Sequence, residues 1–233
     1  MQNISITFQS QKLSIPLNYQ YGIQSLIYNL LDKDWHDSGV FYGERKYKLF
    51  TFSSLRGKKK IANGKITFED LIYLDVRGVR DDFCTDLRLA LDTANDLTLL
   101  GQNLFVKSVK CNSPQIDTDT ICVKMLSPLT IHKTENGKTF YYTPLDSEFS
   151  KEIDLNFRRK YAAFTGRNLD DGIKIVPVNV GVKDKYVTTF KNTRITAWRG
   201  EYQLFGKQEY LNFLYYCGLG ARNSEGFGMF ELI

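Results

Sequence analysis

The chain has 233 residues, with 31 Lys and Arg against 26 Asp and Glu, and its formal net charge is +5. Hydrophobic residues make up 42% and charged residues 24%, which is the composition of a folded globular protein and excludes a disordered or fibrous chain. No apolar run approaches the roughly 18 residues that span a bilayer, and the first residues lack the basic and apolar segments of a secretory signal. We therefore expect a cytoplasmic protein that does not contact a membrane.

The first half of the chain has the pattern of a β-α-β-β-α-β unit. Apolar and polar residues alternate over 3–8, which predicts a strand that Pro16 ends, and apolar residues recur at helical spacing over 23–31. The further predicted elements are strands at 48–53, 66–68, 71–76 and 97–109 and a helix at 81–93. Asp81 or Asp82 is expected near the N-cap of that helix. This order is that of the ferredoxin-like fold.

The second half repeats the order. Strands are predicted at 121–132, 138–142, 173–182, 186–191, 194–205 and 226–232, and helices at 146–164 and 206–216. Asn136 and Gly137 mark a tight hairpin turn, and Asp146 is expected to cap the first of these helices. We therefore predict an α+β protein of two tandem ferredoxin-like domains, 1–115 and 116–233. The duplication rests on element order, because the halves share no clear residue repeat.

Residues suited to metal or cofactor chemistry are sparse. No CxxC pair occurs among the four cysteines, which are Cys84, Cys111, Cys122 and Cys217. This excludes a zinc ribbon and favours buried thiols in a reducing compartment. Two histidines are too few for a His-based metal cluster, and the acidic residues show no metal-ligand spacing. The P-loop and dinucleotide-binding glycine patterns are both incomplete. We expect neither a metal nor a cofactor.

Basic residues are concentrated between positions 44 and 65. This segment holds eight Lys and Arg and one acidic residue, Glu44, so its net charge of +7 exceeds that of the whole chain. A basic patch of this kind suits a polyanion. Lys58-Lys59-Lys60 taken alone can also be a solvated loop. Arg45, Lys46 and Lys48 lie beside a histidine and a predicted strand, where a solvated loop is the weaker explanation.

The most specific motif is the glycine-rich segment at 218–228. Its sequence, GLGARNSEGFG, places four glycines in eleven residues between a predicted helix and a predicted strand. Glycine permits positive φ angles and close backbone approach, and exposed N–H groups in such a loop can hold a phosphate. The alternative is a tight structural connection between helix and strand.

Three segments carry a family resemblance. GLGARNSEGFG resembles the glycine-rich signature of the CRISPR-associated endoribonucleases of the Cas6 family, within the repeat-associated mysterious protein (RAMP) superfamily. The run IPLNYQYGIQSLIYNLL, continuing through WHDSG to KYKLFTFSSL, is similar to the N-terminal region of that family, and KMLSPLTI looks like the opening strand of its second domain. The resemblance implies tandem ferredoxin-like domains. It also implies metal-independent cleavage of precursor CRISPR RNA within its repeats, leaving 2′,3′-cyclic phosphate and 5′-hydroxyl ends.

The resemblance further implies three catalytic residues. The family's catalytic histidine follows the first helix and matches His36, its helical tyrosine matches Tyr28, and the lysine that opens the KLFT strand matches Lys48. The chemistry agrees, because cleavage by a 2′-hydroxyl needs a base, an acid and positive charge at the phosphorane, and imidazole ordinarily titrates near neutral pH. At about 100° per residue, Tyr28 lies off the buried stripe of its helix. A boundary tyrosine, a loop or C-cap histidine and a solvated lysine are the alternatives.

Further basic and glycine-loop residues are predicted to bind RNA, namely Arg45, Lys46, Lys183, Lys185, Arg194, Arg199, Gly218, Gly220, Arg222, Asn223, Gly226 and Gly228. Those of the second domain before the glycine motif, together with Lys191, would line a hairpin that follows the phosphates of an RNA stem. Arg158-Arg159-Lys160 is expected to close a helix, where cations also complement the helix dipole. His132, beside a hairpin turn, is expected on the surface.

These observations favour an endoribonuclease acting on CRISPR repeat RNA, with His36 as general acid/base, Lys48 as charge stabiliser and Tyr28 as the positioning residue. A non-catalytic repeat-RNA-binding or structural subunit of an effector complex is the first alternative. An unrelated ferredoxin-like protein that binds a small ligand is the second. Effector complex proteins are expected as further partners, and both a monomer and a homodimer are compatible with the sequence.

Overall fold

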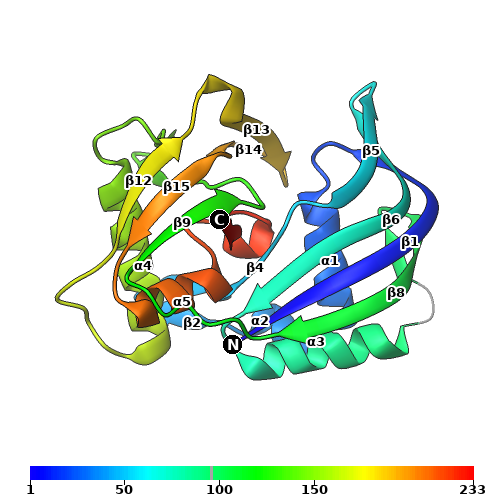
Figure 1. Ribbon diagram of the computed structural model, residues 1–233, viewed down its shortest axis with the longest axis horizontal. Helices are drawn as coiled ribbons and strands as arrows, with labels where there is room; N and C mark the ends of the chain where they lie inside the picture. Colours follow the sequence, from blue (N-terminus) through cyan, green and yellow to red (C-terminus); the bar gives the residue numbers. More distant parts are fainter. Residues whose placement is uncertain (95–96) are drawn as a thin grey trace.

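The computed structural model describes residues 1–94 and 97–233, in which helices pack against two larger antiparallel sheets. In Figure 1 the first sheet lies on the right, the second on the left, and the C-terminal segment between them. Among the described residues, the helices are all too short or too polar to cross a membrane.

The first sheet has the strand order β4-β6-β1-β8-β7, with β5 also paired to β6. Its strands are β1 (Gln2–Pro16), β4 (Phe50–Phe52), β5 (Arg56–Ala62), β6 (Lys65–Gly78), β7 (Leu97–Leu99) and β8 (Gln102–Asn112). Helices α1 (Gln20–Leu30) and α3 (Asp81–Thr93) contribute Ile23, Ile27 and Leu87 to one hydrophobic core. Ile6 and Leu74 of the sheet enter the same core, so the apolar stripe of each helix is buried against the strands.

The second sheet has the equivalent order β12-β15-β9-β16. Its strands are β9 (Thr120–Met125), β12 (Lys174–Asn179), β15 (Glu201–Phe205) and β16 (Phe230–Leu232), and its helices are α4 (Phe149–Thr165) and α5 (Gln208–Cys217). Phe157 and Leu211 of the helices pack with Val123 and Tyr202 of the strands. The α+β class and the tandem ferredoxin-like fold are therefore confirmed, while the division into 1–115 and 116–233 stays a prediction.

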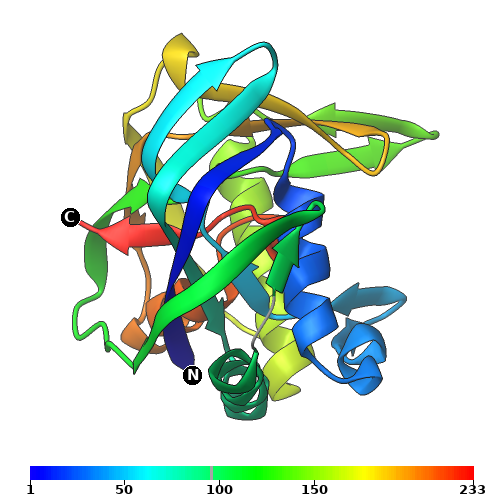
Figure 2. The same cartoon turned by 90° about the vertical axis from the view of Figure 1, so that its right-hand side faces the viewer.

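Additional short elements decorate both units. They are α2 (Lys33–Asp37), β2 (Val40–Tyr42) and β3 (Arg45–Tyr47) in the first, and β10 (His132–Glu135), β11 (Lys138–Tyr141), β13 (Lys185–Phe190), β14 (Thr193–Trp198) and the 3-10 turns η1 (Val182–Asp184) and η2 (Asn223–Glu225) in the second. The pairs β2–β3, β10–β11 and β13–β14 are hairpins. Figure 2 shows the last two hairpins side by side, reaching out beyond the second sheet.

Several predicted strand boundaries were wrong where pairing with a neighbour decides the geometry. Strand β1 continues through Pro16, because after a bulge between Ser10 and Leu13 it keeps pairing with β6 as far as Lys65. The two strands predicted at 66–68 and 71–76 are the single strand β6, in which Asp70 takes a φ of 66° opposite the bulge. The predicted strands 97–109 and 194–205 are each divided in two, and the strand predicted at 121–132 ends at Met125.

The predicted helix starts were partly right. Helix α3 begins at Asp81 as expected, directly after its N-cap residue Arg80, and the Asp82 carboxylate accepts the Phe83 N–H of the first turn at 2.8 Å. Helix α4 begins at Phe149 instead of 146, because the Asp146 carboxylate accepts the Thr143 N–H at 2.7 Å and forms a turn before the helix. The Asn136-Gly137 turn is confirmed, with φ angles of 49° and 74°.

Candidate active site and RNA-binding surfaces

The structure brings the three predicted catalytic side chains together at the end of α1. Tyr28 lies in its last turn, His36 in the short helix α2, and Lys48 just before β4. The rings of Tyr28 and His36 are 4.9 Å apart between centroids, and the Lys48 ammonium lies 5.8 Å from the Tyr28 ring centre. The His36 ring is exposed and Tyr28 is half-buried. Their catalytic roles stay predictions.

Helix α2 is held in place by Trp35, the neighbour of His36. The Trp35 indole N–H donates to Asp86 of α3 at 3.0 Å, and its ring packs edge-on against Phe83 at 5.5 Å. The Arg80 guanidinium covers the same indole at 4.7 Å. Because Trp35 is anchored from several sides, the backbone of the next residue is fixed and the His36 ring is presented to solvent.

The His36 imidazole has a defined tautomer. Its Nε2 lies 3.1 Å from the backbone carbonyl oxygen of Tyr28. A carbonyl oxygen only accepts hydrogen bonds, so Nε2 carries the proton in this contact. The lone pair of the neutral ring is therefore on Nδ1, which is the nitrogen able to accept a proton from a substrate.

Lys48 both closes helix α2 and brings a positive charge beside His36. Its ammonium donates to the carbonyl oxygens of Trp35 (3.3 Å), His36 (2.6 Å) and Ser38. A cation at the C-terminal end of a helix satisfies carbonyls that have no partner within the helix. Partial burial, and then the charge of Lys46, lower the pKa of Lys48, which makes its ammonium a better proton donor than that of an exposed lysine.

Tyr28 is suited to donate a hydrogen bond and not to act as a base. Burial, and then the charge of Glu225, raise the pKa of Tyr28 to about 12. Its ring packs edge-on against Phe50 at 5.9 Å. The hydroxyl is therefore protonated at neutral pH and held by packing of the ring, which agrees with the positioning role predicted for it.

Two adjoining hollows lie beside these residues. The Tyr28 hollow, of about 400 Å³, is lined by Gln24, Tyr28, Lys48, Phe190, Lys191, Thr193, Arg222, Ser224 and Glu225. The His132 hollow, of about 430 Å³, is lined by Arg45, Lys46, Tyr47, Lys48, Leu49, His132, Asn156, Lys160 and residues 220–225. The two hollows share Lys48, Arg222, Ser224 and Glu225, so the glycine-rich segment and Lys48 form their common wall. His36 lines neither hollow, but its ring contacts Tyr28.

The glycines of the 218–228 motif are explained by packing. All four are buried, and a Cβ atom on Gly220 or Gly228 would lie 2.4 Å from the Thr130 carbonyl oxygen or 1.9 Å from that of Leu219. Their φ angles of 65° and 78° also favour glycine. The structure therefore supports the tight-connection alternative for Gly218, Gly220, Gly226 and Gly228, and RNA contact by them stays a prediction. In this motif Arg222 and its neighbours reach the hollows.

Asn223 and the fully buried Lys160 hold this loop from inside. The Lys160 ammonium donates to the carbonyl oxygens of Gly218 (2.7 Å) and Gly220 (3.1 Å) and to Asn223 Oδ1 (3.0 Å). The Asn223 amide donates in turn to the Leu219 and Phe227 carbonyls at 2.8 and 3.0 Å. Burial lowers the pKa of Lys160. The prediction that residues 158–160 close a helix was wrong, because α4 continues to Thr165 and turns Lys160 into the core.

The predicted RNA-binding cations of the second half are divided between two places. Arg199 lines a groove of about 850 Å³ between the two sheets, together with Arg56, Lys59 and Lys124. Its guanidinium lies over the Tyr186 ring at 5.2 Å. The exposed residues Lys183, Lys185 and Arg194 lie on η1 and the β13–β14 hairpin, outside the hollows and the groove. Residues 58–60 are part of strand β5, so the loop alternative for them was wrong.

His132 was missed by the sequence interpretation. It is half-buried in the His132 hollow instead of lying on the surface. Burial, followed by the charges of Arg222 and Arg45, lowers its pKa to about 4. The ring lies 5.4 Å from that of Tyr141 across the β10–β11 hairpin. The sequence signal was its position next to the apolar Ile131, two residues after Leu129, which makes a wholly exposed side chain less expected.

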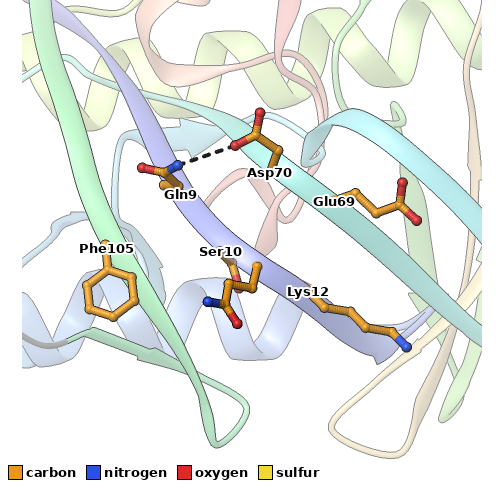
Figure 3. Close-up of a pocket in the computed structure, with 7 residues that line it drawn as sticks. Gln9, Ser10, Lys12, Glu69, Asp70 and Phe105 are labelled. Carbon is orange, nitrogen blue, oxygen red and sulfur yellow. Dashed lines mark hydrogen bonds between the residues drawn. The ribbon is translucent and has the colours of Figure 1, made fainter.

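A further hollow, of about 670 Å³, lies at the bulge of β1 and is lined by Gln9, Ser10, Gln11, Lys12, Glu69, Asp70 and Phe105 (Figure 3). The Gln9 amide donates to Asp70 at 3.3 Å. Two carboxylates and one lysine line this hollow, a charge balance that does not suit an RNA backbone.

The fold and the site define a tandem ferredoxin-like protein with a tyrosine–histidine–lysine cluster beside a glycine-rich loop. Two family models match it, CRISPR-associated protein Cas6, N-terminal, over residues 14–110 and CRISPR associated protein Cas6, C-terminal, over residues 111–232. The chain belongs to the Cas6 family.

Individual relatives agree with this assignment. The CRISPR-associated endoribonuclease Cas6 1 of Methanocaldococcus jannaschii is 29% identical over 92% of this chain and 86% of its own length. The CRISPR-associated endoribonuclease Cas6 of Pyrococcus furiosus is 22% identical over 96% and 86% of the two chains. A solved structure of a CRISPR associated protein Cas6 is similar with a TM-score of 0.81 and 25% identity, over 100% of this chain and 99% of that one.

Proposed function

We propose that this protein is an endoribonuclease that cleaves precursor CRISPR RNA within its repeats without a metal ion. The observation that carries the proposal is the contact of the exposed His36 ring with Tyr28, beside the Lys48 ammonium. Two relatives that match most of the chain carry the name endoribonuclease, which supports RNA cleavage as the activity. CRISPR repeat RNA is the proposed substrate, and association with effector complex proteins is part of the proposal.

In the proposed reaction the 2′-oxygen forms a bond to the adjacent phosphorus while the bond from phosphorus to the 5′-oxygen breaks. His36 Nδ1 accepts the proton of the 2′-hydroxyl, the leaving 5′-oxygen takes a proton from a solvent water molecule, and the His36 imidazolium then returns its proton to solvent. The products are a 2′,3′-cyclic phosphate and a 5′-hydroxyl. Lys48 is the cation beside the developing phosphorane, and the Tyr28 hydroxyl donates a hydrogen bond that orients the reacting group.

The charge of the neighbouring surfaces supports an RNA partner. Arg222 and Lys191 line the Tyr28 hollow, and Arg199 lines the groove between the sheets. Cations spread over several hollows of one surface can contact a phosphate backbone, and such binding weakens as salt is added. We therefore expect salt-dependent binding of repeat RNA over a surface larger than the catalytic cluster.

The test is incubation of the protein with its host's repeat RNA in EDTA. We expect cleavage at one position, with 2′,3′-cyclic phosphate and 5′-hydroxyl ends. A substrate carrying a 2′-deoxy nucleotide just 5′ of that position should bind within about two-fold of the unmodified RNA and stay intact, because the nucleophile is absent. Cleavage of the deoxy substrate would refute 2′-hydroxyl attack. Tight binding without any cleavage of the unmodified RNA would favour the non-catalytic alternative.

Tyr28→Phe tests the hydroxyl separately from the ring. The aromatic packing on Phe50 is kept, so the melting temperature should stay unchanged. Loss of one positioned donor should lower the single-turnover cleavage rate about 100-fold. Tyr21→Phe, in an exposed tyrosine of the same helix, is the matched control and should retain the wild-type rate. A wild-type rate for Tyr28→Phe would remove the hydroxyl from the mechanism.

A further inference from the structure

Buried polar atoms without a partner gather around the His132 hollow. In the described residues, eight buried side-chain polar atoms have no hydrogen-bond partner. Four of them belong to residues that line this hollow, namely Tyr47 Oη, His132 Nδ1, Asn156 Oδ1 and Arg222 Nε. Buried polar groups in a folded protein are normally hydrogen-bonded, so a concentration of unpaired ones indicates a ligand that completes them.

The donor and charge pattern of the hollow identifies the class of ligand. Tyr47 and Arg222 offer donors, His132 Nδ1 can donate or accept, and the Asn156 amide can present either of its ends. Arg45, Lys46 and Lys48 add positive charge, whereas the carboxylate of Glu225 is already paired with Arg222 at 2.8 Å. Several donors, a surplus of cations and one neutralised carboxylate suit a phosphate group better than a base or a cation.

His132 gives this hollow a feature that a simple cluster of cations lacks. Its ring is half-buried in a hollow that Arg45 and Arg222 also line, and its pKa of about 4 means that the free protein holds it neutral at physiological pH. A monoanionic phosphodiester in the same hollow would offset the charge of Arg45, because that of Arg222 is already balanced by Glu225. The neutral ring can donate its N–H to an oxygen of the anion without adding charge to the hollow of the free protein.

We propose that His132, Arg45 and Arg222 form a second phosphate subsite, which holds a phosphodiester of the bound RNA next to the scissile one. This inference rests on the proposed function. The His132 hollow shares Lys48 and Arg222 with the Tyr28 hollow, so a strand that places one phosphate beside Tyr28 can place a neighbouring phosphate beside His132. Binding of the neighbouring phosphate fixes the position of the RNA strand along the site, so His132 is a positioning residue and not a catalytic one.

The experiment is a phosphate scan on an RNA that carries the 2′-deoxy block. Single uncharged methylphosphonate linkages are placed in turn on either side of the scissile position, and binding is measured for the wild type, Arg45→Ala and His132→Gln. We expect one neighbouring position at which loss of charge weakens wild-type binding about ten-fold and has no further effect in either variant. Arg45 is exposed, so its removal leaves the core intact.

Controls distinguish a phosphate subsite from a base-binding pocket and from a general loss of affinity. Lys133→Ala, in an exposed residue next to His132, should show the wild-type pattern at every linkage. Equal, additive effects at all positions in all variants would overturn the subsite. A second set of RNAs carries single abasic nucleotides. If the two variants lose the effect of an abasic nucleotide but not that of a methylphosphonate, the hollow binds a base and the phosphate subsite is overturned. If unmodified RNA is bound and cut but no position couples, the subsite alone fails. If RNA is not bound, the proposed function fails as well.

Discussion

Replacement of His36 by alanine is expected to abolish cleavage of repeat RNA while leaving binding within about two-fold of the wild type. Loss of a positioned general base or acid lowers rates by about 10²- to 10⁴-fold. The ring is exposed and lines neither hollow, so its loss removes little surface from the RNA. Lys48 and Trp35 continue to hold the backbone of α2, because their contacts do not involve the His36 side chain.

The measurement is the single-turnover rate in EDTA, together with the dissociation constant for the 2′-deoxy RNA. Lys33→Ala, in an exposed residue of the same short helix, is the control for disturbance of α2 and should cleave at the wild-type rate. Added free imidazole should restore part of the rate to His36→Ala, since the site is open to solvent, and a purely structural role would not respond. Unchanged cleavage by His36→Ala, with the same product ends, would show that another group moves the proton.

The fold could be predicted from the sequence because its determinants are local. The apolar spacing at 23–31 matches α1, the Asn136-Gly137 pair forms the expected hairpin turn, and the order of main strands and helices was right in both halves. The wrong strand boundaries lie where pairing with a strand distant in the sequence determines how far a strand extends. No residue near Ile15 signals that β6 will hold β1 in register through Pro16, or that Asp70 will bend across a bulge and keep one long strand continuous.

In the candidate site, too, some features could be predicted from the sequence and others depend on the three-dimensional packing. The resemblance pointed to Tyr28, His36 and Lys48, and the structure brings them together. The resemblance could not show that the Lys48 ammonium is hydrogen-bonded to α2 carbonyls or that the four glycines are buried, both of which the structure shows. The positions of Lys160 and His132 depend on which loop packs over them, and a sequence carries no local signal of burial for a lone lysine inside a basic run.

Replacement of the buried Lys160 by methionine is expected to destabilise the protein and to disable the site from a distance. Methionine has a similar length, but its thioether cannot donate to the Gly218 and Gly220 carbonyls or to Asn223. Each buried acceptor left unpaired costs about 1–3 kcal/mol. Among the described residues no carboxylate pairs with the Lys160 ammonium, so the wild-type protein buries an uncompensated charge. Methionine removes the desolvation cost of that charge, which offsets part of the loss. We expect a net loss of about 3 kcal/mol in the free energy of unfolding.

For a chain of this length such a loss lowers the melting temperature by about 10 °C, which a thermal melt measures directly. Lys151→Met, in an exposed lysine of the same helix, should leave the melting temperature unchanged. Hydrogen exchange should accelerate first at the Leu219 and Ala221 amides. These amides donate hydrogen bonds to the Gly228 and Thr130 carbonyl oxygens, and those bonds depend on the shape of the loop. Because Arg222 follows those residues, the same variant should bind and cut repeat RNA at least about ten-fold less well at temperatures where it is still folded. A stable Lys160→Met protein with wild-type exchange at these two amides would mean that the glycine-rich loop keeps its shape through packing alone.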